Sequence, residues 1–86
     1  MKIKNGFVLR EAAGSYVVMN VGGELAFNGM ITLNETGAVI WRGIEAGKSY
    51  AQIAEDIVAE YDIDLDTALR DVIRFTEKMN EAGVIE

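Results

Sequence analysis

The hydrophobic pattern of this 86-residue chain changes its period once, close to Asn34. Before Asn34, apolar residues alternate with polar ones or gather in short β-branched and aromatic runs, which is typical of strands. After Asn34 they recur every three to four residues, which is the spacing of helices. Because strands followed by helices segregate into a sheet with helices on one side, the pattern predicts an α+β fold.

Three strands are expected in the first part of the chain. Residues 7–12 and 15–21 form the first two, with Gly14 in the turn between them. Residues 26–33 form the third, interrupted by Gly29, and a glycine inside a strand is typical of a bulge or of the close approach of another backbone. The prediction is a three-stranded antiparallel meander.

The first two helices are expected to begin at caps. Asn34 is a good N-cap residue because its side-chain oxygen accepts a bond from an early helical N–H, and Gly47 ends this segment. Ser49 opens the second helix, and Gln52, three residues later, completes a capping box. Apolar residues recur at helical spacing through 50–61.

The third helix, expected over residues 65–82 between the cap Asp64 and the stop Gly83, has a broad apolar side. At about 100° per residue its apolar positions fan over roughly 180°, whereas a core-facing stripe needs only about 100°. Two explanations stay open. Either a small domain buries this helix on two sides, or one margin, near Phe75 and Met79, is left for a partner.

The residue types that the chain lacks narrow its chemistry. There is no Cys and no His, so thiol chemistry, the commonest general base and the commonest transition-metal ligand are missing. Asp62, Asp64 and Asp66 have the first half of calcium-loop spacing. Thr67 and Ile73, however, stand where that loop needs a Gly and a Glu. We therefore expect a protein that is not an enzyme and uses no metal or cofactor.

The charge of the chain bears on its partners. The net charge is −6, with 14 acidic and 8 basic residues, which disfavours binding to nucleic acid or to anionic membrane surfaces. No apolar run approaches the roughly 18 residues of a membrane span. The expectation is a cytoplasmic protein with a single domain over residues 1–86.

An ordered set of short motifs is distributed over residues 33–85 of the chain. These motifs are residues 33–41 (LNETGAVIW), 47–49 (GKS), 53–57 (IAEDI), 60–64 (EYDID), 71–75 (DVIRF) and 83–85 (GVI). In order and spacing they resemble the PqqD family, named for its role in pyrroloquinoline quinone biosynthesis. The resemblance implies a winged-helix-like arrangement of three antiparallel strands followed by three helices.

The resemblance also implies a function. Proteins of this family recognise ribosomally synthesised precursor peptides that are later modified. The leader segment of the precursor adds as a fourth strand to the third strand, by β-augmentation, and its side chains enter a groove against the third helix. A separate enzyme, for example a radical SAM protein or a leader peptidase, then modifies the peptide. This chain would be the free, unfused kind of recognition protein.

The implied peptide site has three parts. It comprises the strand edge (Ala26, Phe27, Asn28, Gly29, Met30, Ile31 and Thr32), the apolar helix margin (Val72, Phe75, Thr76 and Met79) and three flanking cations for acidic leader residues (Arg70, Arg74 and Lys78). Which of the helical residues face the groove depends on the rotation of the helix about its axis.

Two other functions compete with peptide recognition. The second and third helices are spaced as in a DNA-binding winged helix, but the third helix interleaves its cations with Asp71, Glu77 and Glu81. The exposed edge of the third strand could instead pair with a second copy in a structural module. We therefore expect a monomer or a weak homodimer.

Overall fold

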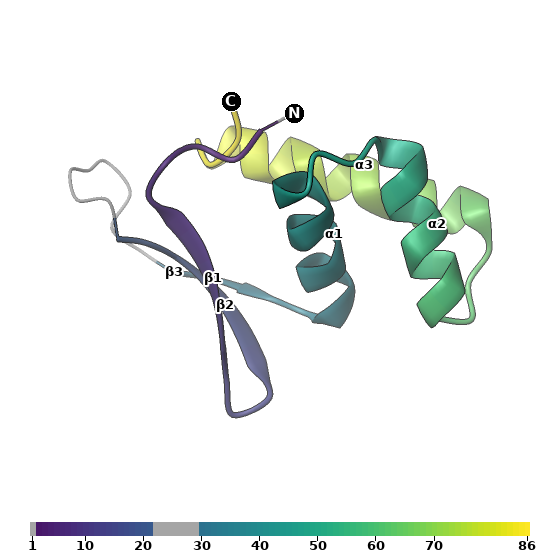
Figure 1. Cartoon of the computed structure of the whole chain (residues 1–86), viewed down its shortest axis with the longest axis horizontal. Coiled ribbons are helices and arrows are strands. Elements are labelled where there is room, and N and C mark those ends of the chain that lie inside the picture. Colours follow the sequence, from purple (N-terminus) through teal and green to yellow (C-terminus); the bar gives the residue numbers. More distant parts are fainter. Residues whose placement is uncertain (1, 22–29) are drawn as a thin grey trace.

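The computed structural model describes residues 2–21 and 30–86. Its elements are β1 (Phe7–Ala12), β2 (Ser15–Asn20), β3 (Met30–Leu33), α1 (Glu35–Glu45), α2 (Tyr50–Glu60) and α3 (Leu65–Glu81), shown in Figure 1. The predicted α+β order of three strands followed by three helices is confirmed. Residues 26–29 of the predicted third strand lie outside the described residues.

The strands form an antiparallel sheet in the order β1-β2-β3. The β1–β2 hairpin turns on Ala13 and Gly14, whose φ angles of 52° and 82° are both in the left-handed region. Two such residues are typical of the tight hairpin turn that matches the natural twist of paired strands. β3 then occupies one edge of the sheet.

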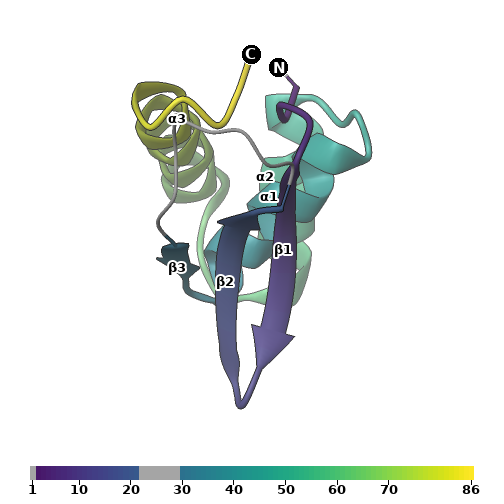
Figure 2. The same ribbon diagram turned by 90° about the vertical axis from the view of Figure 1, so that its left-hand side faces the viewer.

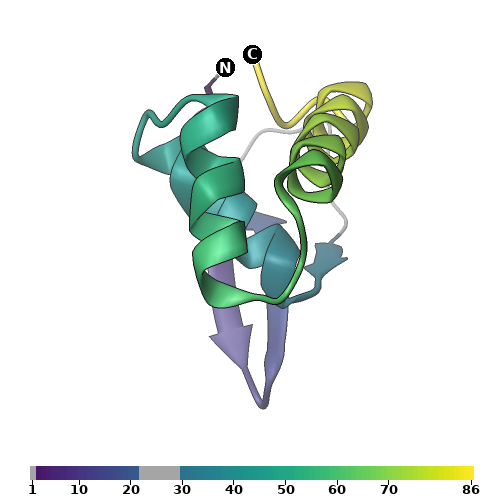
Figure 3. The same ribbon diagram turned by 90° about the vertical axis from the view of Figure 1, so that its right-hand side faces the viewer.

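The register divides the side chains of the sheet between two faces. One face carries Phe7, Leu9, Tyr16, Val18, Ile31 and Leu33, which pack into or against the core. The helices lie on that side, with α3 next to the β3 edge: Figure 2 shows β1 and β2 in front of α1 and α2, with α3 to the left of these strands, and Figure 3 shows α2 in front of β1 and β2. The fold therefore has two layers with one core between them.

Helix α1 forms the centre of the core. Trp41 is fully buried, and Gly43 lies against α2. A Cβ atom on Gly43 would come within 2.6 Å of Cγ1 of Ile53, so the missing side chain allows α1 and α2 to pack closely.

All three predicted N-caps are confirmed. The bonds are Gly37 N to Asn34 Oδ1 (2.8 Å), Gln52 N to Ser49 Oγ (3.2 Å) with Ser49 N to Gln52 Oε1 (2.9 Å) in return, and Thr67 N to Asp64 Oδ1 (2.8 Å). The bond from the backbone of Thr67 holds the pKa of Asp64 below its ordinary value. Asp64 therefore acts as a cap, and in the described part of the chain no three His, Cys, Asp or Glu side chains cluster as a metal site.

The two ends of the chain are held together by a short backbone pairing that no pattern in the sequence predicts. Ile3 bridges Ile85, and the amide of Lys4 donates to the carbonyl of Val84 at 2.9 Å. Val84 and Ile85 are buried, so the pairing closes the core beyond the end of α3.

No helix within residues 2–21 and 30–86 is long and apolar enough to cross a membrane.

We expect Gly43→Ala to destabilise the fold. Alanine is favoured over glycine in a helix by about 1 kcal/mol, but overpacking a tight contact costs about 1–3 kcal/mol. Urea unfolding followed by Trp41 fluorescence measures the net loss. Combining Gly43→Ala with Ile53→Ala, which removes the clashing atoms, should cost less than the sum of the two single changes. A Gly43→Ala variant more stable than the parent would contradict the close packing.

Candidate functional site

The hydrogen-bond ladder of the sheet determines which backbone groups of β3 are free. The amide of Val21, just after β2, donates to the carbonyl of Gly6 at 2.7 Å. Bonded and non-bonded pairs alternate along an antiparallel ladder. Counting back from Val21 in steps of two, the backbone groups of Met19, Val17 and Ser15 therefore bond to β1. The residues between them, including Tyr16 and Val18, turn their backbone groups toward β3.

These groups of β2 meet Leu33 and Ile31, the register partners of Tyr16 and Val18. The N–H and C=O groups of Met30 and Thr32 consequently point away from β2, toward the outer edge of the sheet. Within the described residues, β3 has no strand on that side. An edge of this kind can bond to another extended chain.

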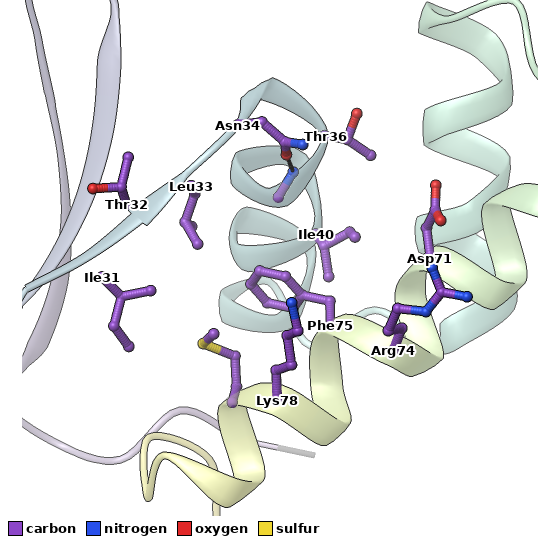
Figure 4. Close-up of a pocket in the computed structure, with 12 residues that line it drawn as sticks. Ile31, Thr32, Leu33, Asn34, Thr36, Ile40, Asp71, Arg74, Phe75 and Lys78 are labelled. Carbon is purple, nitrogen blue, oxygen red and sulfur yellow. Dashed lines mark hydrogen bonds between the residues drawn. The ribbon is translucent and has the colours of Figure 1, made fainter.

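A cavity of about 350 Å³ lies between β3 and α3, with the first turns of α1 at its back (Figure 4). It is lined by Ile31, Thr32, Leu33, Asn34, Thr36, Gly37, Ile40, Asp71, Arg74, Phe75, Lys78 and Met79. Its size is that of a small binding pocket. We call the free edge of β3 together with this cavity the β3–α3 groove.

The floor of the groove is apolar. Leu33, Ile40 and Met79 belong to the core, and their exposed fractions are 8% or less. The half-buried ring of Phe75 packs against the start of α1, where a Cβ on Gly37 would lie 3.4 Å from Cε2 of the ring and 3.2 Å from Cβ of Leu33. Glycine at position 37 therefore leaves room for the aromatic wall of the groove.

The rim of the groove is charged. Arg74 and Lys78 are exposed on α3, and Asp71 is half-buried one turn earlier. Figure 4 shows Phe75 and Lys78 projecting from α3 toward α1 and β3. The lining thus has two cations and one carboxylate in a chain whose net charge is −6. This local excess of positive charge favours an anionic group on a bound partner.

Six of the residues proposed from the sequence line the cavity together: Ile31, Thr32, Arg74, Phe75, Lys78 and Met79. Met30 contributes backbone to the edge, but the register turns its side chain to the other face, where 68% of it is exposed. Ala26, Phe27, Asn28 and Gly29 lie outside the described residues.

Three other proposed residues lie away from the cavity lining. Val72 is fully buried in the core. Thr76 is also buried, and its hydroxyl donates to the carbonyl of Ile73 at 2.9 Å. Arg70 is exposed on α3 but does not line the cavity. The rotation of α3 explains this, because Val72 and Thr76 fall on the stripe that packs on the other helices, and the groove lies along the neighbouring stripe.

The contributions of α1 and of Asp71 to the groove do not follow from the sequence pattern. The back of the groove is lined by Asn34, Thr36, Gly37 and Ile40, although the sequence predicts Asn34 only as a helix cap. One signal was available: the cap follows the edge strand without a loop, so the first turn of α1 must lie beside that edge.

Known proteins share the sequence pattern and the fold of this chain. Residues 15–85 match the family described as Coenzyme PQQ synthesis protein D (PqqD). A structure of TbiB1 in complex with the TbiA(beta) leader peptide is 27% identical, with a TM-score of 0.83 over 100% of this chain and 95% of that one. A lasso peptide synthetase B1 complexed with the leader peptide is 20% identical and shares the fold, with a TM-score of 0.83 over 99% of this chain and 95% of that one. The search of curated proteins gave no match. The match to the family covers most of the length of this chain. The chain therefore belongs to the PqqD family.

Proposed function

We propose that this chain binds the leader segment of a ribosomally synthesised precursor peptide and presents it to a separate modifying enzyme. The observation that carries the proposal is the β3–α3 groove, in which a free strand edge runs beside an apolar cavity. The similarity to TbiB1, 27% identical over the whole chain and complexed with a leader peptide, supports the same role here.

The leader binds as a fourth strand alongside β3. Its backbone bonds to the outward N–H and C=O groups of Met30 and Thr32, and these main-chain bonds supply affinity for many sequences. A strand at this position lies about 4.8 Å from β3, between β3 and α3. Its side chains alternate, so every second one points into the cavity.

The cavity supplies the sequence preference. Apolar leader side chains bury against Phe75 and Met79, and a carboxylate on the leader pairs with Arg74 or Lys78. Burial of apolar area contributes about 25 cal/mol per Å², whereas an exposed ion pair contributes at most about 1 kcal/mol. The apolar contacts therefore dominate affinity, and the charged rim fixes the register of the peptide.

In this proposal the separate enzyme, and not this chain, carries out the chemical modification of the precursor peptide. Binding by backbone pairing and apolar burial needs neither the His nor the Cys that this sequence lacks. A radical SAM protein and a leader peptidase are the two candidate classes of partner.

The first test concerns the strand edge. Thr32→Pro removes one N–H that points to the free edge, and proline is tolerated at such edge positions because no bond within the sheet is lost. We expect the affinity for a labelled leader peptide, measured by fluorescence anisotropy, to fall at least tenfold. Thr32→Val keeps the N–H and the branched shape, so it should bind within about twofold of the parent. Equal binding by the proline variant would exclude backbone pairing at this edge.

The second test concerns the cavity. Phe75→Ala removes the aromatic wall, so the leader loses buried apolar contact and its affinity, measured by calorimetric titration, should fall at least tenfold. Ile73→Ala is the matched control because it removes an apolar side chain from the same helix, 44% exposed and outside the cavity lining. Thermal unfolding confirms that both variants fold. If the two variants lose affinity equally, the cavity is not the peptide site.

A further inference from the structure

A second cavity, of about 320 Å³, lies on the side of α3 that faces away from the β3–α3 groove. It is lined by Tyr50, Thr76, Glu77, Asn80, Ile85 and Glu86. At about 100° per residue, Asn80 of this lining and Lys78 of the groove point about 160° apart around the helix. Figure 1 shows the yellow end of the chain beside the last turns of α3, where this cavity lies. The two cavities therefore flank one helix on opposite sides.

The polar groups of the second cavity are suited to accept hydrogen bonds. Glu77 and Glu86 have carboxylates, which only accept when they are ionised. Oη of Tyr50 lies 3.4 Å from Oγ1 of Thr76. The single hydroxyl proton of Thr76 is donated to the carbonyl of Ile73, so the hydroxyl of Tyr50 is the donor in its contact with Thr76. The lone pairs of the Tyr50 oxygen are thus left for a ligand that donates.

The charge of the second cavity is opposite to that of the groove. Among the described residues its lining has two carboxylates and no cation, whereas the lining of the groove has two cations and one carboxylate. The one ion pair within residues 2–21 and 30–86 joins Lys48 to Asp56, so no cation of this part of the chain neutralises either glutamate. Two carboxylates beside a tyrosine ring suit a Lys or Arg side chain, because the face of the ring also attracts a cation.

Apolar side chains continue from the second cavity along the same side of α3. Leu65, Leu69 and Ile73 recur at intervals of four residues, which is the spacing of one helical side. The next residue in this series is Glu77 of the cavity lining. Tyr50, Leu65 and Ile73 are three of the six large apolar side chains exposed in the described part of the chain. We call these apolar residues and the second cavity together the far side of α3, and its exposed apolar area is typical of an interaction site.

We infer that the far side of α3 binds a basic segment of the modifying enzyme, with a Lys or Arg side chain of that segment in the second cavity. Apolar side chains of the same segment pack on Leu65, Leu69 and Ile73. The inference rests on the proposed function, in which a separate enzyme must reach the leader that this chain holds. A basic segment is the complementary occupant because an acidic or neutral one leaves Glu77 and Glu86 without a cation. The leader and the enzyme occupy opposite sides of α3, so both bind at the same time.

The test measures binding of the leader complex of this chain to the purified enzyme that modifies the precursor, immobilised on a biosensor. Glu77→Lys places a cation in the second cavity, so we expect enzyme binding to weaken at least tenfold, with leader affinity within twofold of the parent. Glu81→Lys is the matched control, since it makes the same change of charge at an exposed position of α3 outside the cavity lining. It should bind the enzyme within about twofold of the parent.

A second variant tests the apolar part of the far side of α3. Ile73→Ala shortens an exposed side chain beside the second cavity without any change of charge. We expect it to weaken enzyme binding at least threefold, because apolar contact with the enzyme is lost, and to keep leader affinity within twofold of the parent. Thermal unfolding of each variant checks that it folds like the parent.

Four results would overturn the inference. The first is an enzyme that does not bind the leader complex of the parent, and the second is unchanged enzyme binding by both Glu77→Lys and Ile73→Ala. The third is an equal loss for Glu81→Lys and Glu77→Lys, which indicates a general effect of charge. The fourth is a parent chain that sediments as a dimer and is dissociated by Glu77→Lys, which assigns this side to a second copy. Failure of the proposed function is distinct, because the parent then binds no leader in the anisotropy measurement.

Discussion

The direct connection of β3 to α1 is the constraint on which the groove depends. Leu33 ends the strand in the core, Asn34 caps the helix, and α1 begins at the next residue. With no loop between them, the first turn of α1 is fixed behind the inner side of β3. Gly37 in that turn leaves space for the ring of Phe75, so α3 approaches from the other side. The edge and the wall of the groove are thereby held at one separation.

This separation suits the binding of an extended peptide. An extended peptide loses much conformational freedom when it is ordered, at roughly 1–2 kcal/mol per residue for the backbone. A preformed edge and a preformed apolar floor add no ordering cost of their own. The same pairing divides the side chains of the peptide between two environments, the cavity on one side and the opposite side of the sheet on the other.

The features that the sequence predicted best are local. The caps at Asn34, Ser49 and Asp64 each depend on a bond to a backbone group three residues away, so the motif and the contact coincide. The antiparallel strands follow from period-two patterns and a glycine turn. The pairing of Ile3 with Ile85 joins residues at opposite ends of the chain, so no local sequence pattern predicts it.

The groove residues were predicted less completely because they depend on tertiary packing. The apolar side of α3 spans two stripes, and only contact with the other helices decides that Val72 is buried while Phe75 lines the cavity. Asp71 lies on the groove stripe for the same geometric reason. The family resemblance correctly indicated the fold, but it could not supply this rotation.

Residue-resolved amide hydrogen exchange, measured by NMR with and without the leader peptide, tests the central claim most directly. If the leader adds to β3 as a fourth strand, the amides of Met30 and Thr32 exchange at least tenfold more slowly in the complex. The amides of Ile31 and Leu33, which the register already pairs with β2, change much less. Tight binding of the leader with no added protection at Met30 and Thr32 would contradict the account.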